Sequence, residues 1–178
     1  AFDIFRAVTE HRHAELQHRA LHDTLTGLPN RALFESRVAE AAARVHDRQL
    51  AAVLFIDLDR FKEVNDSFGH RLGDVVLATV AARLRSAVRH EDLIARLSGD
   101  EFAVLLEGLP GAEEAERIAQ VLVGLCAAPI ELSGHEVALS CSIGIALCPR
   151  HAVTADALVR AADSALYRSV DGARIRFA

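Results

Sequence analysis

The sequence has no long apolar run and no excess of positive charge. Its apolar stretches, such as residues 121–130, fall well short of the roughly 20 residues that cross a bilayer, and no signal peptide opens it. Lys and Arg number 20 against 25 Asp and Glu, a net charge of −5, which argues against electrostatic capture of nucleic acid or of an anionic membrane. We therefore expect a cytoplasmic protein with no nucleic-acid partner and no membrane insertion in this segment.

Cysteine is also scarce. Only Cys126, Cys141 and Cys148 are present, and their spacing is not that of a metal site. An odd number of cysteines fits a reducing compartment better than a disulfide framework, so we expect all three to be small core residues. Apolar types make up 51% and charged types 25% of the 178 residues, which excludes a disordered chain and suffices for the core of one ordinary domain.

The pattern of apolar and polar residues predicts a linker helix over residues 1–22 and one domain over residues 23–178. The elements expected in that domain are a helix ending near 46, strand 51–56, a helix from about 60 broken near Gly69 and Gly73, helix 74–88, strands 92–97 and 102–106, helix 110–126, strand 137–147, helix 154–168 and strand 174–177. This order predicts an α/β fold, specifically an α+β sandwich with a central mixed sheet flanked by helices.

Carboxylates stand at two turning points of this pattern. Asp57 is expected just past the end of the first strand, and Asp100 and Glu101 occupy the tip of the predicted hairpin. If the hairpin lies beside that strand, the three carboxylates converge and repel one another unless a cation lies between them, and oxygen ligands favour Mg²⁺ or Mn²⁺. Gly99 would let a phosphate approach the backbone. Each carboxylate alone is as well explained by solvation of a turn, so the prediction depends on their combination.

Six ordered blocks of residues carry a family resemblance. They are DTLTGLPNR at 23–31, DLDRFKEVND at 57–66, the pairs Gly69-His70 and Gly73-Asp74, SGDEF at 98–102, SIG at 142–144 and ADSALY at 162–167. Over about residues 23–177 the chain resembles the GGDEF family, the diguanylate cyclases that join two GTP molecules into cyclic di-GMP, with an SGDEF variant of the signature loop. The resemblance implies the palm-like fold of nucleotide cyclases.

The resemblance also implies a metal and phosphate site. Two Mg²⁺ (or Mn²⁺) ions per active site would be held by Asp57, Asp100, Glu101 and the carbonyl of Leu58. Lys62 would lie against the phosphates and joins the three carboxylates as a catalytic residue. The ions would activate the 3′-hydroxyl of one GTP and stabilise charge on the α-phosphate of the other. Because each domain holds one GTP, the active unit implied is a homodimer.

The remaining substrate residues are implied in the same way. Asn65 and Asp74 would read guanine, since a carboxylate accepts from N1–H and the 2-amino group, donors that adenine lacks there. Phe61, Gly99 and Arg174 complete the expected substrate-binding set.

Arg89 and Asp92 resemble the family's product-inhibition motif. They lie three residues apart and at the family's distance from the signature loop. An arginine fork can bind a phosphate or guanine of cyclic di-GMP, and the carboxylate can bind the guanine edge. The alternative is an ordinary surface pair at a helix end. The sequence does not indicate the second arginine that usually completes such a site.

Two positions depart from the family pattern. Ser98 replaces the first glycine of the loop, and Val170 stands where family members carry a phosphate-binding Lys, although Arg174 is retained. Loss of one charge-assisted bond would weaken GTP binding by about 1–3 kcal/mol.

Three functions remain open. The first is a diguanylate cyclase domain with product inhibition, flanked by sensory or phosphodiesterase domains. The second is a weak or inactive GGDEF module that binds GTP or cyclic di-GMP and regulates an adjacent, possibly phosphodiesterase, domain. The third is a related palm-type cyclase or polymerase fragment, which would not explain the spacing of Arg89 and Asp92.

Overall fold

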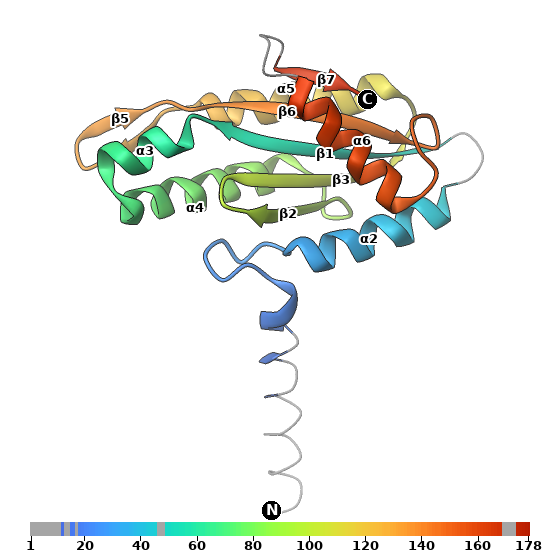
Figure 1. The fold of residues 1–178 in the computed structure, drawn as a ribbon, viewed down its shortest axis with the longest axis horizontal. Helices are drawn as coiled ribbons and strands as arrows, with labels where there is room; N and C mark the ends of the chain where they lie inside the picture. The colour runs from blue at the N-terminus through green and yellow to red at the C-terminus, as the bar shows by residue number, and fades with distance from the viewer. Residues whose placement is uncertain (1–11, 13–14, 17, 46–48, 169–173) are drawn as a thin grey trace, which may run out of the picture.

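A five-stranded mixed sheet forms the centre of the molecule. The computed structural model describes residues 12, 15–16, 18–45, 49–168 and 174–178. The strands are β1 (Leu50–Asp59), β2 (Leu93–Ser98), β3 (Glu101–Leu109), β6 (Ser140–Cys148) and β7 (Ile175–Phe177), in the order β2-β3-β1-β6-β7. Three neighbouring pairs are antiparallel, and β6 and β7 are parallel. The mixed sheet flanked by helices confirms the predicted fold class (Figure 1).

Helices cover both faces of the sheet. One face packs against α3 (Phe61–Phe68), α4 (His70–Ala87) and α5 (Ala112–Ala127), and the other against α2 (Arg31–Arg44) and α6 (Ala155–Arg168). Side chains of β1 alternate between the two: Leu54 and Ile56 belong to the first core, Val53 and Phe55 to the second. Because a strand directs successive side chains to opposite faces, a strand buried on both sides has to be apolar throughout.

Helix α6 lies unusually close to the sheet. A Cβ on Gly144 of β6 would collide with the backbone of Ala162 and Leu166 of α6, so only glycine permits this approach. The contact fixes the ADSALY segment relative to β1 and β6.

Several sequence expectations need correction. The helix break near Gly69 is confirmed, but Gly73 lies inside the first turn of α4. Asp57 lies within β1, which runs on to Asp59. The strand expected over 137–147 begins at Ser140, and a small hairpin of β4 (Ile130–Leu132) and β5 (His135–Val137) precedes it. Strands of three residues are too short for their alternation to be recognised.

Other expectations are confirmed or lie outside the described residues. All three cysteines are buried and free. Residues 18–21 are helical, whereas most of the predicted linker helix, together with Val170, falls outside the described residues. In the portion of the chain that the structure describes, no helix is both long and apolar enough to span a membrane.

Candidate active site

The three predicted carboxylates meet where β1 and β3 pair. Asp57 lies directly opposite Glu101 in the antiparallel register, and the N–H of Leu58 donates to the carbonyl of Asp100 at 3.3 Å. Asp57 continues the sheet face of Val53 and Phe55, and Glu101 continues that of Ala103 and Leu105. The two carboxylates therefore extend the face that α2 and α6 cover, at the edge of its apolar core.

The carboxylates at this point repel one another, and the effect is largest at Asp57. Burial, together with the negative charges of Asp100, Glu101 and Asp59, raises the pKa of Asp57 from 3.8 to about 6. Asp59 is held separately, since its oxygens accept hydrogen bonds from the hydroxyls of Ser140 at 2.6 Å and Ser142 at 2.9 Å. Repulsion of this kind is what a divalent cation would relieve.

A cavity of about 240 Å³ opens beside these carboxylates. Its lining comprises Asp57, Asp59, Glu101, Ser142, Asp163, Leu166 and Tyr167. No role is predicted from the sequence for Asp59, Asp163 or Tyr167, although all three stand in the family blocks. That membership was the signal that could have identified them.

The donor set fits a magnesium ion that arrives with a nucleotide. Among the described residues, no three His, Cys, Asp or Glu side chains form a metal site by themselves. Mg²⁺ commonly binds through only one or two protein carboxylates, with substrate phosphates and water supplying the other ligands. The Asp57 and Glu101 carboxylates, Asp100 and the Leu58 carbonyl are of the right chemical type for that role.

The two predicted guanine readers lie on consecutive helices. Gly73 packs so tightly that a Cβ there would overlap Oδ1 of Asn65 and approach the ring of Phe61 at 3.3 Å. The carboxamide of Asn65 therefore lies against Gly73 in the first turn of α4. Asp74, which follows Gly73 in the chain, is exposed. Phe61 is buried beneath them. The structure thus brings Asn65 and Phe61 together beside Gly73, and Asp74 is the next residue along the chain.

The predicted phosphate-binding residues are less closely grouped. Lys62 is exposed in the first turn of α3, directly after Arg60, whose φ of 59° turns the chain out of β1. Arg174 is exposed at the start of β7, where its carbonyl accepts from the N–H of Ile143 at 2.7 Å. Within the described residues, neither side chain forms an ion pair with the carboxylates of β1 and β3.

An arginine missed by the sequence analysis ties the signature turn to the start of the domain. Arg96 donates to both carboxylate oxygens of Asp23 at 3.1 Å and to the carbonyl of Gly99 at 2.9 Å, while its N–H donates to the carbonyl of Pro29 at 3.0 Å. Burial opposes ionisation of Asp23, but hydrogen bonds from Thr26 and Arg96 hold its pKa below the usual value.

The predicted inhibitory pair lies near the opposite end of β3. Asp92 is buried and accepts from Nε and an Nη of Arg89, both at 2.9 Å, and from the Arg89 N–H at 3.1 Å. The hydrogen bond to Asp92 raises the pKa of the guanidinium. Arg89 also donates to the carbonyl of Glu107 at 3.0 Å and lies 3.6 Å from Glu91. The pair is therefore preformed.

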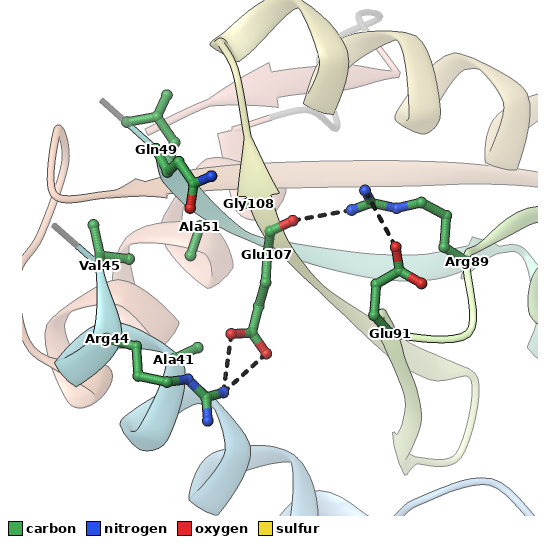
Figure 2. Close-up of a pocket in the computed structure, with 10 residues that line it drawn as sticks. Ala41, Arg44, Val45, Gln49, Ala51, Arg89, Glu91, Glu107 and Gly108 are labelled. Atoms are coloured by element: carbon green, nitrogen blue, oxygen red, sulfur yellow. Dashed lines mark hydrogen bonds and ion pairs between the residues drawn. The ribbon is translucent and has the colours of Figure 1, made fainter. Parts of the chain in front are cut away.

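Figure 2 shows a second arginine, Arg44, on the other side of Glu107 from Arg89. Arg44 of α2 and Arg89 line one cavity of about 440 Å³, and Glu107 lies between them, accepting from Arg44 at 2.9 and 3.2 Å. The sequence does not indicate Arg44, because Arg44 belongs to none of the six blocks and is brought to Arg89 only by the packing of α2.

The mixed sheet flanked by helices and the SGDEF turn between β2 and β3 define the class of domain to which the chain belongs. The chain belongs to the GGDEF family: the family described as "Diguanylate cyclase, GGDEF domain" matches residues 20–174.

Similar proteins include the diguanylate cyclase TpbB of Pseudomonas aeruginosa, which is 51% identical over 93% of this chain and 38% of TpbB. The bifunctional diguanylate cyclase/cyclic di-GMP phosphodiesterase MucR of the same organism is 48% identical over 90% of this chain and 23% of MucR. A solved structure of TpbB comprising only its GGDEF domain covers 88% of this chain, matches over 94% of its own length and has a TM-score of 0.84. The chain thus spans well under half the length of these curated relatives.

Proposed function

We propose that this domain is a diguanylate cyclase that condenses two GTP molecules into cyclic di-GMP, releasing two pyrophosphates. The observation that carries the proposal is the pairing of Asp57 with Glu101 beside Asp100, where burial and the neighbouring negative charges raise the pKa of Asp57 to about 6. Carboxylates that repel one another and line a cavity fit a cation-dependent reaction of phosphates.

In this proposal each residue has a defined task. Asp57, Asp100, Glu101 and the Leu58 carbonyl hold two Mg²⁺ or Mn²⁺ ions. When bound, such ions supply the positive charge that offsets the triphosphate and lowers the pKa of the attacking hydroxyl. Lys62 follows the left-handed turn at Arg60, from which it reaches the phosphates. Arg174 reaches them from the start of β7.

The guanine base is read by Asn65 and Asp74. The support is that Asn65 packs against Gly73, the residue before Asp74, and that Asp74 is exposed. An exposed carboxylate can accept from N1–H and the 2-amino group. Phe61 forms the apolar floor of this site.

The chemical step needs two domains. The 3′-hydroxyl oxygen of one GTP attacks the α-phosphorus of the other, the bond to the departing pyrophosphate breaks, and the hydroxyl proton leaves to solvent. The 3′-hydroxyl of the second nucleotide then attacks the α-phosphorus of the first in the same way. This step releases the second pyrophosphate and closes the ring. Because one domain holds one GTP, a homodimer is required with its two sites facing each other.

Product inhibition is proposed at the Arg44 and Arg89 cavity. Cyclic di-GMP has two phosphates and two guanines, and this cavity offers two guanidinium groups. Asp92, buried behind the cavity lining, holds the guanidinium of Arg89 in place. The site lies at the Leu109 end of β3, and the catalytic turn at the Glu101 end. Product bound there would act by holding two domains in an arrangement that separates their GTP sites.

A second candidate function follows from the departure at position 170. A GGDEF module with Val in place of the phosphate-binding Lys could bind GTP or cyclic di-GMP and regulate a neighbouring domain. MucR, which combines a cyclase with a phosphodiesterase, illustrates a protein in which such a neighbour exists.

Product identification distinguishes the two functions. The protein is incubated at high concentration with GTP and Mg²⁺, and the nucleotides are separated by chromatography and identified by mass spectrometry. Cyclic di-GMP together with pyrophosphate supports the cyclase. If the parent binds GTP but leaves it unconverted, and Asp57→Asn forms no less product than the parent, the result supports the binding module.

A further inference from the structure

Ser98 is the residue at which the signature loop departs from the family, and its hydroxyl contacts a predicted metal ligand. Ser98 closes β2 and Glu101 opens β3, and the two are paired across the turn. The Ser98 hydroxyl donates to Oε2 of Glu101 at 2.7 Å. A glycine at this position offers no such donor.

Arg31 approaches the same oxygen from α2. Its guanidinium nitrogen lies 3.8 Å from Oε2 of Glu101, and it stands at the first position of α2, at the end of the DTLTGLPNR block. Both groups therefore act on Oε2. Among the described residues, Oε1 of Glu101 has no hydrogen-bond partner, and Glu101 lines the cavity that it shares with Asp57.

We propose that Ser98 is a positioning residue for Glu101, assisted by Arg31: the two hold Oε2 in place so that Oε1 is presented to the cation that enters with the nucleotide. The inference rests on the function proposed above. It assigns a role to a residue of this chain that the family resemblance presents only as a departure.

The physical basis is the cost of ordering a metal ligand. Glu101 is partly exposed, and a free glutamate side chain loses rotamer freedom when it binds an ion. A hydrogen bond that already fixes one oxygen reduces this loss, and outer hydrogen-bond partners of metal ligands typically change metal affinity by 10–100-fold. A neutral hydroxyl also adds no positive charge that would repel the cation.

Arg31 is expected to contribute less than Ser98. Its side chain is 46% exposed and that of Glu101 42%, and exposed ion pairs are weak because solvent screens them. Its positive charge also opposes the incoming cation at short range. The hydroxyl is therefore the principal anchor and the guanidinium a secondary one.

The test measures Mn²⁺ binding by electron paramagnetic resonance with a saturating non-hydrolysable GTP analogue. Ser98→Ala is expected to weaken Mn²⁺ binding on the order of tenfold, and Arg31→Gln about twofold. Ser98→Thr, which keeps the hydroxyl, should bind like the parent. Ser86→Ala is the matched control, because Ser86 is an exposed serine whose hydroxyl donates only to a carbonyl of its own helix, that of Arg83 at 2.7 Å.

A thermal melt without metal separates positioning from a general structural effect. Ser98 has no left-handed backbone, so Ser98→Ala should melt within a degree or two of the parent. Ser98→Ala that binds Mn²⁺ as well as the parent, or Ser98→Thr that binds as weakly as Ser98→Ala, would overturn the inference while leaving the proposed function intact. A parent protein that takes up no Mn²⁺ with the nucleotide would overturn both.

Discussion

Asp57 and Glu101 face each other across β1 and β3, on the sheet face that also carries Val53 and Phe55. The alternation that buries the apolar residues of β1 thus also places its carboxylate opposite that of β3. The pairing is set by the strand register, so a shift of one residue would direct Glu101 to the other face.

Asp57→Asn should stabilise the cation-free protein. The pKa of Asp57 is about 6 in the fold against an ordinary 3.8, so between these values the folded state binds more protons than the unfolded state. The free energy of unfolding of the parent therefore falls as pH rises through this window. Asp57→Asn removes this contribution, and because the site is partly solvated we expect a gain of about 1–2 kcal/mol at pH 7.5 and little at pH 4.

Urea denaturation in EDTA at both pH values measures this gain. If the free energies of unfolding of parent and variant differ by the same amount at pH 4 and pH 7.5, the raised pKa of Asp57 is not the cause of the difference. Adding Mg²⁺ with a GTP analogue should stabilise the parent and have little effect on the variant.

Asp74→Ala should reduce discrimination between GTP and ATP. The parent is expected to bind GTP more tightly than ATP, because the N1–H and the 2-amino group of guanine donate to the Asp74 carboxylate. Adenine has neither donor. Removal of the carboxylate leaves those donors unpaired, at a cost of about 1–3 kcal/mol to GTP binding. Calorimetric titration of both nucleotides into both proteins tests this, and equal affinities of the parent for GTP and ATP would contradict it.

Val170→Lys should tighten GTP binding by restoring the phosphate partner of the family pattern. The expected gain is about 1–3 kcal/mol, as for a charge-assisted hydrogen bond, with a higher rate at sub-saturating GTP. Binding of cyclic di-GMP, measured in parallel, should not change. No change in GTP affinity would mean that the phosphates lie away from the segment after Tyr167.

Glu107→Gln should strengthen cyclic di-GMP binding. Glu107 engages the Arg44 guanidinium at 2.9 Å and would repel a phosphate in the same cavity. The partly exposed pair of Arg44 and Glu107 is worth about 0.2–1 kcal/mol. Its loss therefore corresponds to a gain of up to about fivefold in affinity for cyclic di-GMP. Arg89→Ala should weaken binding and lift product inhibition without changing GTP affinity.

Calorimetric titration with cyclic di-GMP measures the affinity of both variants. Glu116→Gln is the control, because it removes one negative charge from an exposed position of α5. If Glu107→Gln weakens binding, Glu107 contacts the ligand itself. If Arg89→Ala binds as well as the parent, product does not occupy this cavity.

Arg96→Gln should destabilise the fold and weaken GTP binding together. The Arg96 side chain is 13% exposed and that of Asp23 22%, so loss of the guanidinium leaves a partly buried carboxylate without its partner, at a cost of about 1–3 kcal/mol. The Gly99 carbonyl also loses its donor. Combining Arg96→Gln with Asp23→Asn should recover part of the stability but not the GTP affinity. Full recovery of both would show that Arg96 does not act on the signature turn.

The sequence allowed the carboxylate cluster to be predicted more fully than its surroundings. Asp57, Asp100 and Glu101 follow an apolar strand and occupy a short hairpin turn. Local pattern and turn chemistry therefore predicted that they meet if the hairpin lies beside that strand, and the pairing of β1 with β3 fulfils this condition. Arg44 and Arg96 were missed because their partners lie far away in the chain, at Glu107 and Asp23. Such contacts depend on how helices and strands pack, which no local pattern encodes.

The central claim is that the carboxylates of β1 and β3 support cyclic di-GMP synthesis, and the most direct measurement is the rate of cyclic di-GMP formation at saturating GTP with and without Mg²⁺. The parent should form product only with Mg²⁺ and faster per domain at higher protein concentration. Asp57→Asn and Asp100→Asn should form none, while Glu116→Gln matches the parent. Product formation by both carboxylate variants at the parent's rate would contradict the account.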